Sequence, residues 1–237
     1  MPARQIVLDT ETTGLNAKLG DRVIEIGCVE VVNRRITERH FHVYVNPERE
    51  IEEGAAKVHG LTREFLADKP RFAEIAQGFL EYVGGAELVI HNAAFDVEFL
   101  DAELGLAGLG TLVAHVAGVV DTLAIARELH PGKRNSLDAL CERYGVDHSK
   151  RMLHGALLDA RLLAEAYLAM TRGQESLIVE EDDAQRDADG APARLDTSQL
   201  VVLRATPAEL AAHDKLLDGI EKEAKHGTIW RMLAARE

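Results

Sequence analysis

The sequence predicts an α/β domain built on a mixed five-stranded sheet flanked by helices, with a flexible C-terminal tail. Strand-like apolar runs with short links at 5–9, 23–32 and 40–45 open the chain and are typical of an antiparallel meander. Two later apolar runs, 88–90 and 116–120, then alternate with helical patterns, which is typical of a sheet covered by helices.

The helices expected after the meander follow the periodicity of the apolar residues. They span 93–103, 122–129, 136–144 and 156–171. Asn92 stands where it is expected to cap the first of them, and Phe95 and Phe99 share one face of that helix. The uncharged run 104–120 contains four glycines and is short for a membrane span, so we interpret it as a buried loop and strand.

Composition and charge limit the possible functions. The chain has 237 residues, 46% of them hydrophobic, and only two cysteines, too few for a disulfide scaffold or a four-ligand zinc site. No secretory pattern opens the sequence, and we expect a reducing, cytoplasmic compartment. The net charge of −13 disfavours autonomous binding to long nucleic acid. Such a protein can still act on a nucleic-acid end if metal ions neutralise its carboxylates and a partner supplies binding energy.

The tail differs in composition from the domain before it. Residues 180–189 hold six acids against one arginine, which predicts a solvated linker, and 200–203 is a candidate short strand. The run Thr206-Pro207-Ala208-Glu209 has the threonine cap, first-turn proline and third-position glutamate of a helix start. One amphipathic helix cannot bury its apolar stripe alone, so we expect it to dock on a partner.

Three groups of polar residues lie at the ends of predicted elements. Asp9 and Glu11 are two apart on the first strand, so both face one way and can bracket a hard divalent cation. Asp96 falls just past the first turn of the helix that follows the strand 88–90. Five residues separate His154 from Asp159, so the two converge only if His154 lies on the loop before the helix, which Gly155 permits.

Each group taken alone has an ordinary structural explanation, such as a strand end, a first-turn acid or a loop histidine. The complete set changes that interpretation. Four clustered carboxylates would repel one another and raise each other's pKa, so they make physical sense chiefly with two bound cations. This is the requirement of two-metal phosphoryl transfer.

The same residues resemble the three motifs of the DnaQ-like (DEDDh) 3′–5′ exonucleases. The matching segments are Asp9-Thr10-Glu11-Thr12-Thr13-Gly14-Leu15, His91-Asn92-x-x-Phe95-Asp96 and His154-x-x-x-x-Asp159. Within that family the segments 131–141 and 153–160 are most similar to the proofreading ε subunits of bacterial DNA polymerase III. The resemblance is strong over residues 4–173 and fainter over 200–230.

The resemblance implies a ribonuclease-H-like fold and a set of functional residues. Asp9, Glu11 and Asp159 would bind one metal ion, Asp9 with Asp96 would serve a second, and His154 would be the general base. The ions would be Mg²⁺ or Mn²⁺. The end of a single-stranded 3′ DNA would contact residues around these ligands. The substrate contacts implied are Asp9, Glu11, Thr12, Thr13, Leu15, His59, Asn92 and Asp159.

The resemblance also implies partners and domain limits. An exonuclease domain would span 1–173, and a sliding-clamp-binding segment at 174–179 would use Gln174, Ser176, Leu177 and Val179. An acidic linker at 180–198 would lead to a segment, 199–237, that binds the polymerase α subunit, with Trp230 as a candidate anchor. Whether a small accessory subunit also binds is left open, and no membrane association is expected.

Two other functions stay open at this point. A stand-alone RNA 3′–5′ exonuclease of the same superfamily is one, although such enzymes lack this tail. A non-catalytic tether between polymerase and clamp is the other, although a tether requires no such set of carboxylates. Activity on DNA, on RNA or on neither separates the three hypotheses.

Overall fold

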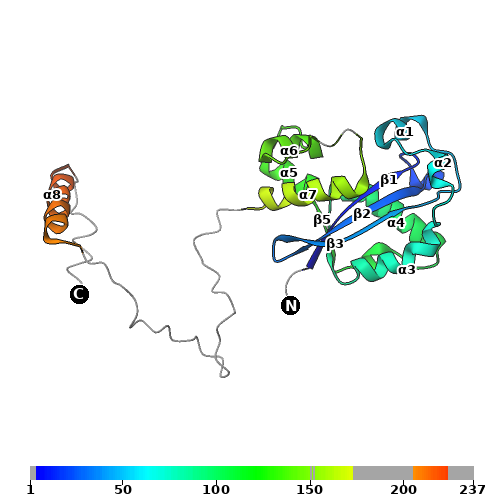
Figure 1. Cartoon of the computed structure of the whole chain (residues 1–237), viewed down its shortest axis with the longest axis horizontal. Helices are drawn as coiled ribbons and strands as arrows, with labels where there is room; N and C mark the ends of the chain where they lie inside the picture. The colour runs from blue at the N-terminus through cyan, green and yellow to red at the C-terminus, as the bar shows by residue number, and fades with distance from the viewer. Residues whose placement is uncertain (1–3, 150, 152, 173–204, 224–237) are drawn as a thin grey trace, which may run out of the picture. The chain divides into compact units, whose positions relative to one another are not determined.

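Figure 1 shows the computed structural model, which describes residues 4–149, 151, 153–172 and 205–223. These residues belong to two units, 1–177 and 178–237, and each unit is described by itself. The first unit contains one mixed sheet of five strands in the order β3-β2-β1-β4-β5. The strands are β1 (Arg4–Thr12), β2 (Val23–Val32), β3 (Arg35–Tyr44), β4 (Glu87–Ile90) and β5 (Gly118–Asp121).

The strand directions confirm the predicted mixed sheet. β1, β2 and β3 are neighbours in antiparallel pairs, whereas β4 runs parallel to both β1 and β5. Because β1, β4 and β5 are parallel, their carboxyl ends meet at one edge, where α/β sheets bind ligands. Asp9 and Glu11 lie in the second half of β1, toward this edge.

Helices cover both faces of the sheet. On one face, α3 (Phe72–Val83) and α4 (Ala93–Leu106) enclose a core that includes Ile6 and Leu8 of β1. On the other face, α5 (Thr122–Leu129), α6 (Leu137–Tyr144) and α7 (Ala156–Met170) pack over Val7. The alternation along β1 therefore sends neighbouring side chains into opposite layers. The described residues of this unit also form four short elements: α1 (Glu53–His59), α2 (Arg63–Leu66), η1 (Ala17–Leu19) and η2 (Leu112–Ala114).

Gly27 of β2 lets α7 approach the sheet closely. A Cβ atom at this position would lie 2.2 Å from the backbone carbon of Ala156 and from the backbone nitrogen of Leu157. Gly27 pairs with Asp9 across the β1–β2 ladder, so the first turn of α7 lies over the strand pair that carries the carboxylates. A larger side chain would push α7, and Asp159 with it, away from β1.

Several boundaries and one cap differ from the sequence predictions. Asn92 precedes α4 as expected, but it adopts a left-handed conformation with φ 65° and its side chain makes no cap hydrogen bond, so the capping prediction is wrong. The run 104–120 is also not a buried loop. Its low charge reflects glycines and alanines, and large side chains such as Leu106 and Val113 are exposed. Helix α4 extends to Leu106, and β5 starts at Gly118.

The second unit contributes α8 (Pro207–Glu223). Its start confirms the predicted capping box, because the Thr206 backbone donates to Glu209 Oε2 at 2.7 Å and the Glu209 backbone donates to Thr206 Oγ1 at 3.3 Å. Within the residues described, no helix is long and apolar enough to cross a membrane. The predicted clamp-binding segment at 174–179, the linker at 180–198, the strand at 200–203 and Trp230 lie outside the described residues.

Candidate active site

The end of β1 presents two carboxylates on one face and holds a carboxylate of α4 on the other. Asp9 and Glu11 share the strand face of Val7, which packs toward α7. Thr10 points the opposite way, and its Oγ1 donates to Asp96 Oδ1 at 2.6 Å. Asp96 is buried in the first turn of α4. Because β1 supplies Asp9, Thr10 and Glu11 in succession, one strand end fixes both the α7-facing and the α4-facing carboxylates.

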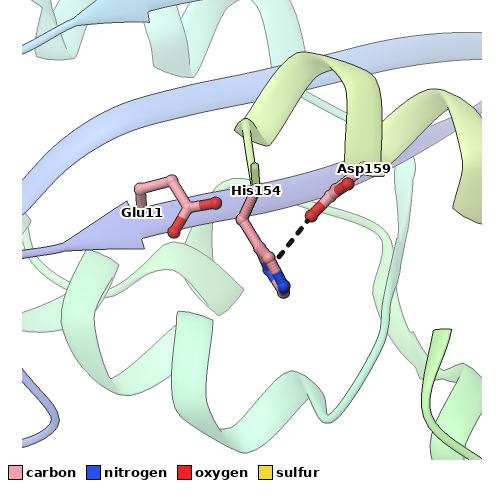
Figure 2. A group of neighbouring side chains, drawn as sticks. All are labelled: Glu11, His154 and Asp159. Carbon is pink, nitrogen blue, oxygen red and sulfur yellow. Dashed lines mark ion pairs between the residues drawn. The ribbon is translucent and has the colours of Figure 1, made fainter. Parts of the chain in front are cut away.

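The loop before α7 and the first turn of α7 supply the remaining candidates. Figure 2 shows Glu11, His154 and Asp159 facing one another, and one possible ligand atom from each lies within 4.8 Å of the others. Helix α7 begins at Ala156, so His154 precedes it, as the spacing predicts. His154 Nδ1 lies 3.4 Å from Asp159 Oδ2. The histidine side chain is 45% exposed and Asp159 is 3% exposed, so the pair spans the boundary between solvent and core.

Arg151 is a site residue that the sequence reasoning missed. Its Nε donates to Asp159 Oδ1 at 2.6 Å and its Nη2 to Asp159 Oδ2 at 2.7 Å. Its Nη1 donates to Asp138 Oδ1 at 2.5 Å, and its Nη2 lies 3.0 Å from His154 Nδ1. No motif or spacing signals this contact, because it depends on how the loop folds back over α7.

Burial and mutual repulsion shape the electrostatics of the cluster. Desolvation, followed by the charges of Asp96, Asp159 and Glu11, raises the pKa of Asp9 well above its usual value. Desolvation, reinforced by Asp159 and Glu25, raises the pKa of Glu11 to about 8. Burial also raises the pKa of Asp96 to about 7, although the hydrogen bond from Thr10 opposes the shift.

These shifts bear on whether the residues fit divalent cations. Hard oxygen donors are the ligands that Mg²⁺ and Mn²⁺ prefer, and bound cations would relieve the repulsion that raises these pKa values. The donor set therefore fits cations of this class.

The predicted substrate contacts lie around the same strand end. Leu15 is 81% exposed at the rim, and the Thr12 hydroxyl donates to the Gly14 carbonyl at 2.6 Å. Thr13 is fully buried, and its hydroxyl donates to Asp21 and accepts from the Arg22 backbone. The Asn92 backbone donates to Asp121 Oδ1 at 3.1 Å. The contacts of these residues with substrate stay predictions.

His59 closes α1 beside the loop that carries His154. Its Nδ1 accepts from the Leu61 backbone at 3.0 Å, and its buried Nε2 has no hydrogen-bond partner among the described residues. The His154 backbone donates to the Val58 carbonyl at 3.1 Å, so the two loops are linked. A buried imidazole nitrogen without a partner is costly, which makes His59 a sound candidate for contacting a ligand.

A pocket of about 700 Å³ lies next to the carboxylates on the α5–α6 side. Asp9, Asp159 and His154 contribute to its wall, and so do three cations. The lining cations are Arg127, Lys133 and Arg151. An acidic chain thus places positive side chains beside its carboxylate cluster, an arrangement that suits a phosphate-bearing ligand.

Comparison with known proteins identifies the family. Residues 6–167 match the family model described as "Exonuclease". The chain is 52% identical to DNA polymerase III subunit epsilon of Escherichia coli K12, over 96% of this chain and 97% of that protein. It is 48% identical to the subunit of the same name from Haemophilus influenzae, over 97% and 95%. This chain belongs to the DNA polymerase III ε subunit family.

Solved structures of other exonucleases share the fold of this chain. Exonuclease X in complex with 5′ overhanging duplex DNA is 27% identical, with a TM-score of 0.56 over 70% of this chain and 90% of that chain. E. coli exonuclease I in complex with a dA16 oligonucleotide is 17% identical, with a TM-score of 0.63 over 73% and 41%, and this likeness concerns the fold alone. The ribonuclease-H-like exonuclease fold is therefore confirmed.

Membership in the ε family gives the activity and its general requirements. The protein is a proofreading 3′–5′ exonuclease of bacterial DNA polymerase III. The family uses divalent metal ions, acts on DNA and associates with DNA polymerase III.

Proposed function

We propose that this ε subunit hydrolyses the last phosphodiester of a single-stranded 3′ DNA end by two-metal catalysis and releases 5′-mononucleotides. One observation carries the proposal: β1, α4, the first turn of α7 and the loop before it bring four carboxylates and a histidine to one edge of the sheet. Each element alone supplies too few ligands, and together they form a cluster that is buried, acidic and next to a pocket lined with cations.

The carboxylates divide between two proposed sites. Asp9, Glu11 and Asp159 would hold one ion, and Asp9 with Asp96 would hold the other. Two ions of Mg²⁺ or Mn²⁺, when bound, would supply Lewis-acid stabilisation of the attacking and leaving oxygens. Thr10 holds the Asp96 carboxylate by a hydrogen bond and so orients it from outside the ligand set.

His154 is proposed as the base that takes a proton from the attacking water. Desolvation and the nearby Arg151 lower the pKa of His154, so the ring is neutral at neutral pH and able to accept a proton. Because an arginine only donates, the contact between Arg151 and Nδ1 places the proton of the neutral ring on Nε2. His154 would gain a free lone pair for water once Arg151 leaves Nδ1.

The terminal nucleotide would lie on the α1 side of the carboxylates. Leu15 at the rim is positioned to act as an apolar wedge, and the unpartnered Nε2 of His59 would hydrogen-bond to the sugar or phosphate. Figure 1 shows α1 and α2 at the other end of the unit from α5 and α6, with β1 between them. A DNA strand that runs from the α1 side of the site to the α5–α6 side would therefore pass over the carboxylates.

The tail would tether the exonuclease at the replication fork in the cytoplasm. Residues 174–179 would bind the sliding clamp, 180–198 would serve as linker, and 199–237 would bind the polymerase α subunit. The preformed, capped start of α8 supports a docking role, because Leu210, Leu216 and Ile220 are exposed apolar side chains on one helix. Two tethers raise the local concentration of the enzyme and offset the weak hold of an acidic protein on DNA.

The test is release of mononucleotides from a 3′-labelled single-stranded DNA oligomer, beside an RNA oligomer of the same sequence. We expect trimming that requires Mg²⁺ or Mn²⁺, stops with chelator and favours DNA. Preference for RNA would contradict the substrate assignment. Lack of hydrolysis of both strands would leave a tethering role only.

A further inference from the structure

Arg151 connects the candidate ligand Asp159 to a second carboxylate outside the metal site. Its side chain is 7% exposed, and its guanidinium group hydrogen-bonds to both oxygens of Asp159. The remaining terminal nitrogen donates to Asp138 Oδ1 at 2.5 Å. Within the part of the chain that the structure describes, Arg151 is the one cationic side chain, other than His154, that forms an ion pair with any of the four clustered carboxylates.

This pairing conflicts with binding of a divalent cation at Asp159. A guanidinium group bound to a carboxylate in a bidentate manner occupies a syn lone pair on each of the two carboxylate oxygens. A metal ion at the same carboxylate needs at least one of those oxygens and would also lie close to a like charge. The two cations therefore compete for one partner.

Asp138 gives the guanidinium group another position. Asp138 lies on α6, its side chain is 49% exposed, and it already accepts a hydrogen bond from Arg151. Both residues line the pocket of about 700 Å³ beside the carboxylates, so there is space for the guanidinium group to withdraw from Asp159 while it stays paired. A buried arginine that lost Asp159 without such a partner would be strongly unfavourable.

We propose that Arg151 and a divalent cation are alternative partners of Asp159, and that Arg151 withdraws to Asp138 when the cation binds. Arg151 is then a positioning residue that sets the metal affinity of the site. Because its Nη2 also contacts His154 Nδ1, its withdrawal frees the histidine lone pair in the same movement. Loading of the metal site and release of the base are thus coupled through one side chain. The inference rests on the proposed role of Asp159 as a metal ligand.

The experiment is titration of the full chain with MnCl₂ in a calorimeter, in the absence of DNA. Arg151→Gln removes the competitor, so we expect Mn²⁺ to bind roughly tenfold more tightly, since a hydrogen-bonded ion pair is replaced by free ligand atoms. Lys133→Gln is the matched control, because Lys133 lines the same pocket without an ion pair to the carboxylates among the described residues. It measures the effect of removing one positive charge alone.

Asp138 supplies the second arm. Asp138→Asn removes the position to which Arg151 withdraws, so we expect weaker Mn²⁺ binding. The same substitution in the Arg151→Gln background is expected to change the affinity far less, because the two residues act as a unit. Arg151→Lys keeps the charge without the fork, and we expect it to bind Mn²⁺ more tightly than the parent but less tightly than Arg151→Gln.

Three results would overturn the inference. Weaker Mn²⁺ binding by Arg151→Gln would mean that Arg151 orients Asp159 for the ion. An effect no larger than that of Lys133→Gln would mean that only charge matters, and equal effects of Asp138→Asn in both backgrounds would remove the coupling. Asp9→Asn separates this inference from the proposed function: if that variant binds Mn²⁺ like the parent, the metal site itself is misplaced and both proposals are wrong.

Discussion

The two halves of the active site carry similar carboxylates in different electrostatic settings. Asp9, Glu11 and Asp96 come from β1 and α4, where burial and the charges of neighbouring carboxylates raise their pKa values. Asp159 comes from α7 and forms a bidentate ion pair with Arg151. One half is thus held by regular elements and lacks a paired cation among the described residues, whereas the other brings its own cation on a loop.

This difference shows that the unfavourable electrostatic repulsion is concentrated among the carboxylates of β1 and α4. The strand half, which carries Asp9, Glu11 and Asp96, has little freedom to relax its repulsion, because β1 pairs with β2 through Glu11 and with β4 up to Leu8. The loop half can exchange one cation for another. On the proposed assignment, the strand half would supply most of the affinity for metal ions, and the loop half would regulate access to the site.

The largest effect is expected from Asp9→Ala, which removes the carboxylate shared by both proposed metal sites. Mononucleotide release should fall by several orders of magnitude, while binding to the polymerase is retained. Glu98→Gln is the control, because Glu98 is a solvent-exposed carboxylate on α4 that pairs with Lys18. Trimming by Asp9→Ala at the parent rate would contradict the assignment of the strand half.

His154→Gln tests the loop half. The loss of a general base is expected to lower kcat roughly a hundredfold to ten-thousandfold. Mn²⁺ affinity should remain within a few-fold of the parent, because His154 is not proposed as a ligand. Joint loss of hydrolysis and Mn²⁺ affinity would instead make His154 a ligand, in agreement with its place beside Glu11 and Asp159.

Gly27→Ala tests the packing that joins the halves. The new Cβ would overlap the α7 backbone, so we expect destabilisation of roughly 1–3 kcal/mol or more, measured by urea denaturation, together with reduced activity. Gly54→Ala is the matched control on α1, where a Cβ meets nothing within 4 Å. That variant should be neutral or slightly more stable. Equal stability of the two variants would show that α7 moves freely.

The smallest effect is a pH dependence at Glu11. Its pKa is about 8 in the folded chain against an ordinary value of 4.5, so the folded state keeps its proton over an interval in which the unfolded state loses it. In the presence of chelator, the parent should lose stability as pH rises from about 4.5 to about 8, by at most a few kcal/mol.

Glu11→Gln provides the comparison because it cannot ionise. Thermal unfolding should show the variant gaining stability relative to the parent across that same interval, and Mg²⁺ should remove most of the difference. A constant difference between the two proteins at all pH values would mean that Glu11 has an ordinary pKa.

The sequence predicted those parts of the molecule that depend on local rules. Strand alternation placed Asp9 and Glu11 on one face, Gly155 allowed His154 to precede α7, and the capping box at Thr206 marked the start of α8. Helix α3 was missed although its buried residues recur at helical spacing, so a closer reading of periodicity would have found it.

Other features could not be predicted because they depend on tertiary contacts. The left-handed backbone of Asn92 follows from the sharp turn between β4 and α4 and overrides its capping preference. The contacts of Arg151 require the loop, α6 and α7 to be in place. Local patterns therefore identified the proposed ligands, but not the arginine that pairs with one of them.

The hydrogen bond between the His154 backbone and the Val58 carbonyl has a thermodynamic consequence. It ties the loop that carries His154 to the helix end that carries His59. A bound 3′ DNA end that orders the Val58–Leu61 segment would favour the same arrangement of the loop that carries His154. By linkage, the ordered loop would strengthen binding of the DNA end by an equal factor. A correctly bound 3′ end would then help to order the site that removes its last nucleotide. Selection of the end and its cleavage would both depend on the same equilibrium, the ordering of the loop that carries His154.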